Sequence, residues 1–107
     1  MNEFRISELA LEELAAILEY ISRDSPLGAE NVSKDLKRTF EAIALFPNVG
    51  RVANIAGKSR RWIAGFGSAY AYLIYFDRVE ETTMIARIVH SARDQAKVFD
   101  RRIDEKP

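Results

Sequence analysis

Arginine side chains and a single histidine are the groups in this chain that could do chemistry or anchor a partner. Arg60 and Arg61 stand directly before Trp62, and a basic pair beside a large aromatic side chain can stack on a nucleic-acid base or anchor a protein interface. The alternative is that Trp62 belongs to the core while the two arginines flank it in solvent. The sequence leaves both interpretations open.

A second candidate group lies at the end of an apolar run. Arg87 interrupts that run, so its charge must reach an acidic partner or an open sheet face, and we favour a structural ion pair. His90 ends the run, where a hydrogen-bonded structural role is commoner than catalysis, because a general base needs matching partners. A serine–histidine–acid triad is disfavoured, because the adjacent Ser91 would point to the opposite face of the strand.

Composition excludes several kinds of site. The chain has no cysteine and one histidine, so neither a thiolate site nor a histidine-based metal site is expected. It also has no Walker-type phosphate loop and no nucleotide-binding glycine fingerprint, so we expect no metal and no cofactor. Its 16 basic and 16 acidic residues cancel, which argues weakly against charge-driven binding of nucleic acid.

The same composition bears on location and domain number. No apolar run approaches the roughly 20 residues that a bilayer-spanning helix needs. The first residues include an acid and lack the apolar segment of a signal peptide. We therefore expect a cytoplasmic protein without membrane contact, and a length of 107 residues suits one domain.

The elements that position the candidate residues centre on a hairpin between residues 70 and 90. Two apolar runs, about 70–76 and 82–90, flank the charged turn 77–81 and are rich in Tyr, Ile, Val and Thr. Both runs are almost continuously apolar, which predicts strands in the middle of a sheet with both faces covered. The rest of the chain must therefore supply that cover.

Two amphipathic helices precede the hairpin. Ser7 can cap a helix that runs to about Ile21. Ser25, followed by Pro26, can start a second helix that ends near Phe46. The first helix carries an apolar stripe at helical spacing, formed by Leu14, Ile17, Leu18 and Ile21. Its acidic residues are expected to form a solvated face: Glu12, Glu13 and Glu19.

Short strands are expected before and after the helices. Residues 3–6 predict an edge strand and residues 59–65 a further strand, whereas the segment 47–57 is expected to be irregular. A short helical turn can form around 95–99. These elements give an α+β fold in the order β-α-α-β-β-β, with a helical hairpin packed on a small antiparallel sheet whose other face is open to a partner. A single domain would span 1–99, followed by a charged tail at 100–107.

Four short motifs follow one another between Phe4 and Asp94. The first is a Phe-Pro-x-x-Gly-Arg pattern at the end of the second helix, formed by Phe46, Pro47, Gly50 and Arg51. The others are Arg60–Trp62, the strand Tyr72, Leu73, Ile74, Tyr75 and Phe76, and the terminal run Arg87, Ile88, Val89, His90, Ser91, Ala92, Arg93 and Asp94. No single motif is specific, but their joint order and spacing resembles the ParE branch of the RelE/ParE toxin superfamily, the toxins of bacterial type II toxin–antitoxin modules.

The chain departs from the family pattern in three places. Ser91 stands where glycine is usual, Phe76 and Asp77 stand where Tyr-Arg is common, and the loop from Gly65 to Ala71 is slightly longer. These departures concern the shape of the sheet face and leave the order of the motifs unchanged.

The resemblance implies a toxin that a ParD-like antitoxin neutralises. The antitoxin would lay a helix and an extended tail along an apolar groove, and DNA would be contacted only through it. Inhibition of DNA gyrase by protein contact is favoured over RelE-like, ribosome-dependent mRNA cleavage, because the net charge is zero and no tyrosine follows Tyr75; Val98 and Phe99 stand near the end instead. The second alternative is a non-toxic relic that only binds its antitoxin and regulates transcription.

The resemblance also implies which residues carry the function. Arg61, Arg87 and Arg93 come from three segments that the family topology would place in one sheet. Candidates for target binding are Arg60, Arg61, Trp62, Arg87, His90 and Arg93. Candidates for antitoxin binding are Trp62, Phe66, Tyr72 and Tyr75. If the protein is a nuclease, the implied catalytic residues are His90, Arg87 and Arg93.

Overall fold

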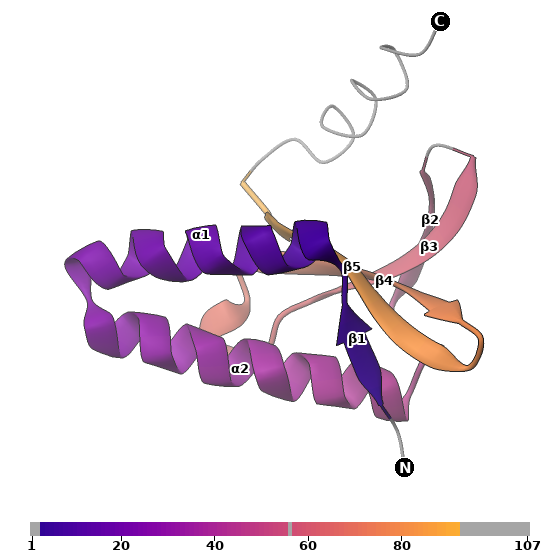
Figure 1. Cartoon of the computed structure of the whole chain (residues 1–107), viewed down its shortest axis with the longest axis horizontal. Helices are drawn as coiled ribbons and strands as arrows, with labels where there is room; N and C mark the ends of the chain where they lie inside the picture. Colours follow the sequence, from indigo (N-terminus) through magenta and orange to yellow (C-terminus); the bar gives the residue numbers. More distant parts are fainter. Residues whose placement is uncertain (1–2, 56, 93–107) are drawn as a thin grey trace, which may run out of the picture.

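A helical hairpin packs against a five-stranded mixed sheet in the computed structural model, which describes residues 3–55 and 57–92 (Figure 1). The elements are β1 (Phe4–Ile6), α1 (Glu8–Asp24), α2 (Pro26–Leu45), β2 (Arg51–Ile55), β3 (Lys58–Ala64), a short 3-10 turn η1 (Gly67–Ala69), β4 (Tyr72–Val79) and β5 (Thr82–His90). The strand order in the sheet is β1-β5-β4-β3-β2. The predicted α+β fold and order of elements are confirmed.

Serine caps begin both helices, as predicted. The hydroxyl of Ser7 accepts a hydrogen bond from the Ala10 N–H at 3.0 Å, and that of Ser25 accepts one from the Gly28 N–H at 2.8 Å. Pro26 occupies the first position of α2, where a missing N–H leaves no helical hydrogen bond unmade. The 17-residue α1 and the 20-residue α2 therefore run antiparallel with only Ser25 between them.

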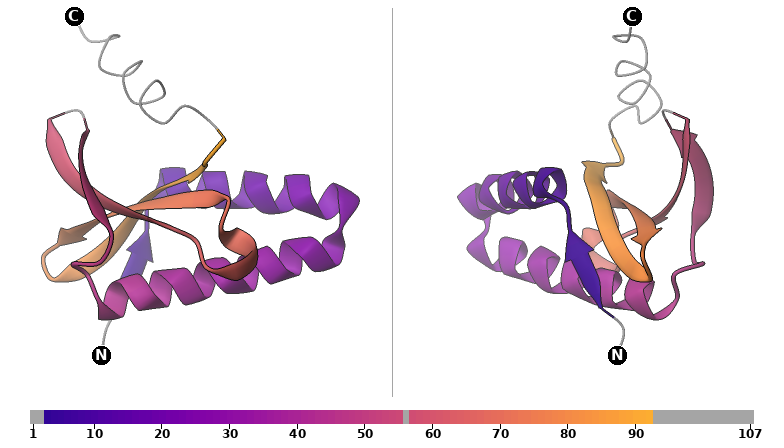
Figure 2. Two further views of the ribbon diagram at one scale, coloured as in Figure 1. Left: turned by 180° about the vertical axis from the view of Figure 1, so that it is seen from behind. Right: turned by 45° about the vertical axis from the view of Figure 1, so that its right-hand side comes forward.

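The two helices lie on one side of the sheet, which Figure 2 shows from two directions. α2 supplies most of the helical part of the core, with Val32, Leu36, Phe40 and Ile43 buried. In α1 only Ala10 is fully buried, and its stripe of Leu14, Ile17, Leu18 and Ile21 is half-buried. α1 is thus the more loosely covered helix of the pair.

A β-bulge explains why the hairpin reads as almost continuously apolar. Tyr75 pairs with Arg87, whereas the next residue, Phe76, pairs with Ile85, so Ala86 is the extra residue of β5. Ile85 and Ile88 are three positions apart and both join the helix-side core. The bulge therefore interrupts the alternation that an ordinary strand would show. The central position of β4 and β5 is confirmed.

The structure corrects two predictions about the sheet. The segment 47–57, expected to be irregular, contains β2, which pairs antiparallel with β3 in a register that sets Arg51 opposite Trp62. A strand of only five residues gives a weak sequence signal, and its pairing with β3 holds it in place. The sheet is also mixed rather than antiparallel, because β1 runs parallel to β5.

The expected helical turn at 95–99 and the tail at 100–107 lie outside the described residues. Within the part of the chain that the structure describes, no helix is long and apolar enough to cross a membrane.

Candidate functional site

The pairing of the strands assigns the candidate residues to two different faces of the sheet. Tyr75 lies opposite both Trp62 and Arg87, so these three side chains share one face. Arg61 lies opposite Phe76, which is buried on the helix side. Arg61 and Arg87 therefore belong to one sheet, as the topology implied, but they lie on opposite faces of it. Arg93 lies outside the described residues.

The face away from the helices carries a small aromatic cluster, which we call the platform: Trp62, Leu73, Tyr75 and Val89. The rings of Trp62 and Tyr75 lie 6.3 Å apart, and the Arg51 guanidinium stands 6.0 Å from the centre of the Trp62 ring. Trp62 is half-buried, so it is neither a core residue nor a fully exposed one. Burial raises the pKa of the Tyr75 phenol, against the opposing effect of the Arg87 charge, so the phenol stays protonated at neutral pH.

Arg87 forms the structural ion pair that we favoured from the sequence. Its Nε and Nη2 donate to Glu13 Oε2 at 2.9 and 2.7 Å, and both side chains are largely buried. The other Glu13 oxygen accepts from the backbone N–H of Ile88 at 2.8 Å. One carboxylate thus neutralises a buried cation and satisfies a backbone donor of β5.

The role of Glu13 corrects the prediction that it is part of a solvated face. β1 covers β5 only between Thr83 and Ile85, and beyond it the side chains of α1 satisfy the exposed edge. The Ser7 hydroxyl donates to Ala86 O, next to the Ile88 N–H that Glu13 binds. The sequence could have indicated the inward position of Glu13. It falls three residues after Ala10 and four before Ile17, which places it on the buried side of α1.

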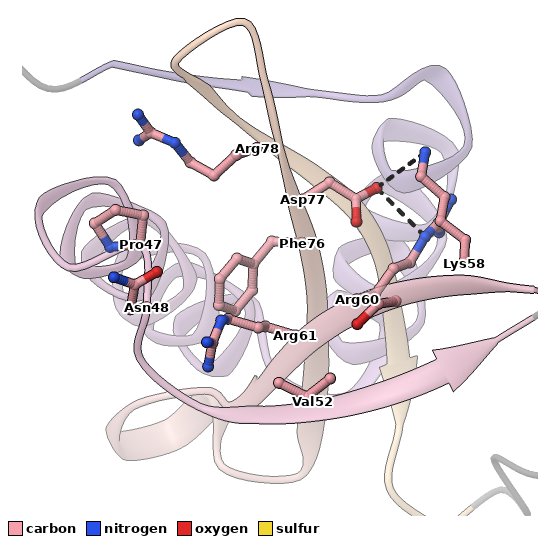
Figure 3. Close-up of a pocket in the computed structure, with 10 residues that line it drawn as sticks. Pro47, Asn48, Val52, Lys58, Arg60, Arg61, Phe76, Asp77 and Arg78 are labelled. Atoms are coloured by element: carbon pink, nitrogen blue, oxygen red, sulfur yellow. Dashed lines mark ion pairs between the residues drawn. The ribbon is translucent and has the colours of Figure 1, made fainter.

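Arg60 forms an ion pair with Asp77 on the neighbouring strand β4. Asp77 Oδ2 is 3.3 Å from Arg60 Nε and 3.7 Å from Lys58 Nζ, and only about 10% of the Asp77 side chain is exposed. Figure 3 shows both basic side chains reaching toward this carboxylate. The two cations are therefore partly neutralised inside the protein.

His90 lies at the end of β5 beside Tyr72, with the two rings edge to face at 5.2 Å. Its Nδ1 accepts a hydrogen bond from the Ala92 N–H at 2.9 Å, which assigns the proton of the neutral imidazole to Nε2. A neutral imidazole has one lone pair for accepting a proton, and here a backbone donor occupies it. This geometry does not suit His90 as a general base.

The four antitoxin-binding candidates do not form one patch. Trp62 and Tyr75 belong to the platform, whereas Tyr72 is buried on the helix side. Phe66 lies in the loop before η1, where its N–H donates to Thr39 Oγ1 at 2.9 Å and its ring lies 5.8 Å from the Arg38 guanidinium.

A carboxylate that the sequence analysis did not single out holds this loop. Asp35 Oδ2 accepts from both the N–H and the hydroxyl of Ser68, at 2.8 and 2.7 Å. Gly67 adopts a positive φ of 50°, and a Cβ there would lie 2.6 Å from the same oxygen. Hydrogen bonds from the Ser68 hydroxyl and N–H, and then from Arg38, lower the pKa of Asp35.

Acid should therefore loosen the loop through Asp35. Because the pKa is lower in the folded chain than in the unfolded chain, the stabilisation is complete above the ordinary value and is lost as pH falls below about 4. We expect the melting temperature to fall less between about pH 5 and pH 3 in Asp35→Asn than in the wild-type chain. The exposed Glu41→Gln, measured in the same scan, should keep the wild-type pH profile, and an unchanged profile in Asp35→Asn would contradict this role.

Within residues 3–55 and 57–92, no three acidic, histidine or cysteine side chains gather in a way that could hold a metal ion.

Comparison with known proteins agrees with the fold and the motifs. Residues 4–95 match the family described as the ParE toxin of type II toxin–antitoxin systems. The chain is also 31% identical to Toxin RelE2 of Caulobacter vibrioides over 84 residues, which cover 78% of this chain and 89% of that protein. A match of this extent shows that the chain belongs to the ParE toxin family of type II toxin–antitoxin systems.

Proposed function

We propose that this toxin inhibits DNA gyrase by protein–protein contact and that a ParD-like antitoxin neutralises it. The choice of mechanism rests on His90, the only histidine. Its Nδ1 already accepts a hydrogen bond from the Ala92 N–H. A toxin that acts by contact needs no general base at this position.

Cleavage of RNA would need a base for the 2′-hydroxyl, an acid for the leaving oxygen and cations for the phosphate. Among the candidate residues, Arg87 is held by Glu13 and Arg60 lies against Asp77. The Tyr75 phenol has a raised pKa and is buried, so it is a poor proton acceptor at neutral pH. The two arginines are thus engaged by carboxylates and the phenol stays protonated, which supports the non-catalytic proposal.

The platform offers features of a protein-binding surface. Trp62 is half-buried, carries Arg51 over its ring and packs on Tyr75. Tryptophan and arginine are enriched among the residues that contribute most to protein interfaces. We therefore assign target contact to Trp62 and Arg51, on the face opposite the helices.

The rival proposal is ribosome-dependent mRNA cleavage. One finding favours it: the related Caulobacter protein carries the name RelE2. The rival would use His90 as acid or base, which would require the imidazole to leave its bond with the Ala92 N–H.

The two proposals predict opposite results for two single substitutions. We expect the purified chain to inhibit gyrase supercoiling with trapped DNA breaks, and His90→Ala to leave this inhibition intact because His90 lies away from the platform. Trp62→Ala should weaken inhibition about 30-fold, the equivalent of about 2 kcal/mol at an interface anchor. Tyr70→Ala is the matched control, because Tyr70 is 74% exposed and lies outside the platform.

The same variants test the nuclease. mRNA cuts on ribosomes that fall roughly 10²–10⁴-fold in His90→Ala, with supercoiling unaffected by the wild-type chain, would replace our proposal with the rival. Thermal melting of each variant separates loss of function from loss of fold.

A further inference from the structure

A cavity on the helix side of the sheet is separate from the platform. It has a volume of about 250 Å³ and lies between the end of α2 and the strands β2, β3 and β4. Its lining includes Pro47, Asn48, Val52, Arg61, Phe76 and Arg78, together with Lys58, Arg60 and the carboxylate of Asp77. We call this cavity the cleft.

Two arginines of the cleft have no acidic partner among the described residues. Within residues 3–55 and 57–92, the side chains of Arg61 and Arg78 make no hydrogen bond or ion pair, whereas Lys58 and Arg60 share Asp77. In Figure 3, Arg61 and Arg78 extend toward the side of Pro47 and Asn48, away from that carboxylate. Arg61 is half-buried, and a half-buried cation is costly unless an anion meets it. The cleft is therefore suited to a negatively charged ligand.

Exposed apolar side chains occur beside the lining of the cleft, and we call these four residues the rim. Leu45 at the end of α2, and Phe46 and Val49 in the following loop, flank Pro47 and Asn48 in the chain and are 56%, 65% and 39% exposed; Val52 of β2 lines the cleft itself and is 58% exposed. A nucleic acid would meet the arginines with phosphates but would leave such a rim uncovered, since its backbone contacts are mainly polar. Apolar and arginine contacts together are typical of protein interfaces.

One edge of the sheet carries Val52 of the rim. β2 is the last strand in the order β1-β5-β4-β3-β2, so one side of its backbone pairs with β3, and among the described residues no strand pairs with the other side. An extended peptide can add to such an edge and place alternate side chains on each face. Val52 lies opposite Arg61, so side chains added on that face would meet the cleft.

We propose that the cleft binds an extended segment of the antitoxin in which acidic residues alternate with apolar ones. The segment pairs with β2, its carboxylates meet Arg61 and Arg78, and its apolar side chains cover Val52 and the exposed rim. The existence of an antitoxin partner follows from the family, and the location and chemistry of the contact are new. This inference rests on neutralisation by an antitoxin but not on gyrase as the target.

The test measures, by titration calorimetry, the dissociation constant of the complex between this chain and its purified cognate antitoxin. We expect Arg61→Gln/Arg78→Gln to weaken binding by about tenfold or more, because each carboxylate loses its cation. Val52→Glu adds a like charge beside the bound acids at an exposed position and should also weaken binding. The control Arg23→Gln/Lys34→Gln removes the same charge from exposed helix positions, and should stay within about threefold of the wild-type value.

Each result decides between separate claims. Unchanged affinity in both cleft variants, with their melting temperatures preserved, overturns the inference. A 12-nucleotide single-stranded RNA that binds the wild-type chain and loses affinity in the arginine variant, while antitoxin affinity is unchanged, overturns it in favour of nucleic acid. Failure of the wild-type chain to bind the antitoxin contradicts the proposed neutralisation itself. Absence of gyrase inhibition contradicts only the proposed target.

Discussion

Glu13→Ala is expected to lower the free energy of unfolding by about 3–5 kcal/mol, the usual cost of removing one partner from a buried ion pair. The Arg87 guanidinium would remain in place with only 7% of its side chain exposed, and the Ile88 N–H would lose its acceptor. Both losses fall on the edge of β5 that β1 does not cover. Chemical denaturation monitored by circular dichroism measures this change.

Glu19→Ala provides the matched control. Glu19 pairs with Arg23 on the same helix, but about 70% of each side chain is exposed. Exposed pairs contribute about 0–1 kcal/mol, so this variant should unfold close to the wild-type midpoint. Equal destabilisation in the two variants would contradict a special contribution of the buried pair.

The Glu13–Arg87 pair also affects how loss of toxicity is interpreted. Arg87→Ala leaves a carboxylate where the cation was, so we expect it to relieve growth inhibition by destabilising the fold. Growth rescue by this variant therefore says nothing about a target contact unless the melting temperature is also preserved. Variants of Trp62 and of the cleft are better probes, since neither Glu13 nor Arg87 belongs to those two sites.

The sequence was sufficient for the elements whose signals are local. Ser7 and Ser25 cap α1 and α2 as predicted, because a capping hydroxyl needs only the next three residues. The turn of the hairpin was also predicted, and the structure adds that Glu80 and Glu81 adopt positive φ angles of 49° and 67°. β2 was missed although its pairing with β3 is local, with Ile55 opposite Lys58.

The arrangement of the candidate site was less predictable. Alternation along β3 separates Arg60 and Arg61 onto opposite faces, so the basic pair predicted from the sequence does not act as one unit. The bulge at Ala86 changes which side chains of β5 point to each face of the sheet, and no local sequence pattern predicts it. Asp35 and Asp77 took their roles from residues on other elements, Ser68 and Arg60, which only the folded chain brings together.

The Phe-Pro-x-x-Gly-Arg motif gains a physical explanation. Phe46 caps the end of α2, its N–H bonding to Ala42 O, and Pro47 follows it. Gly50 then has a φ of 86°, and a Cβ at this position would lie 2.4 Å from the Trp62 carbonyl oxygen and 2.5 Å from Ile63 Cγ2. The glycine therefore lets the chain pass directly against β3 just before Arg51 begins β2.

Gly50→Ala should consequently be among the most damaging single-methyl changes in the chain. The positive φ costs an alanine about 1–2 kcal/mol, and the clash with the backbone of β3 adds roughly 1–3 kcal/mol, so we expect a total loss of about 2–5 kcal/mol. Gly57→Ala separates the two causes, because Gly57 has a similar φ of 75° but nothing within 4 Å of the added Cβ. Denaturant midpoints of the two variants should differ by the steric part alone. Equal midpoints would mean that β2 can move away from Trp62 at no cost, and that the tight approach at Gly50 does not position the platform.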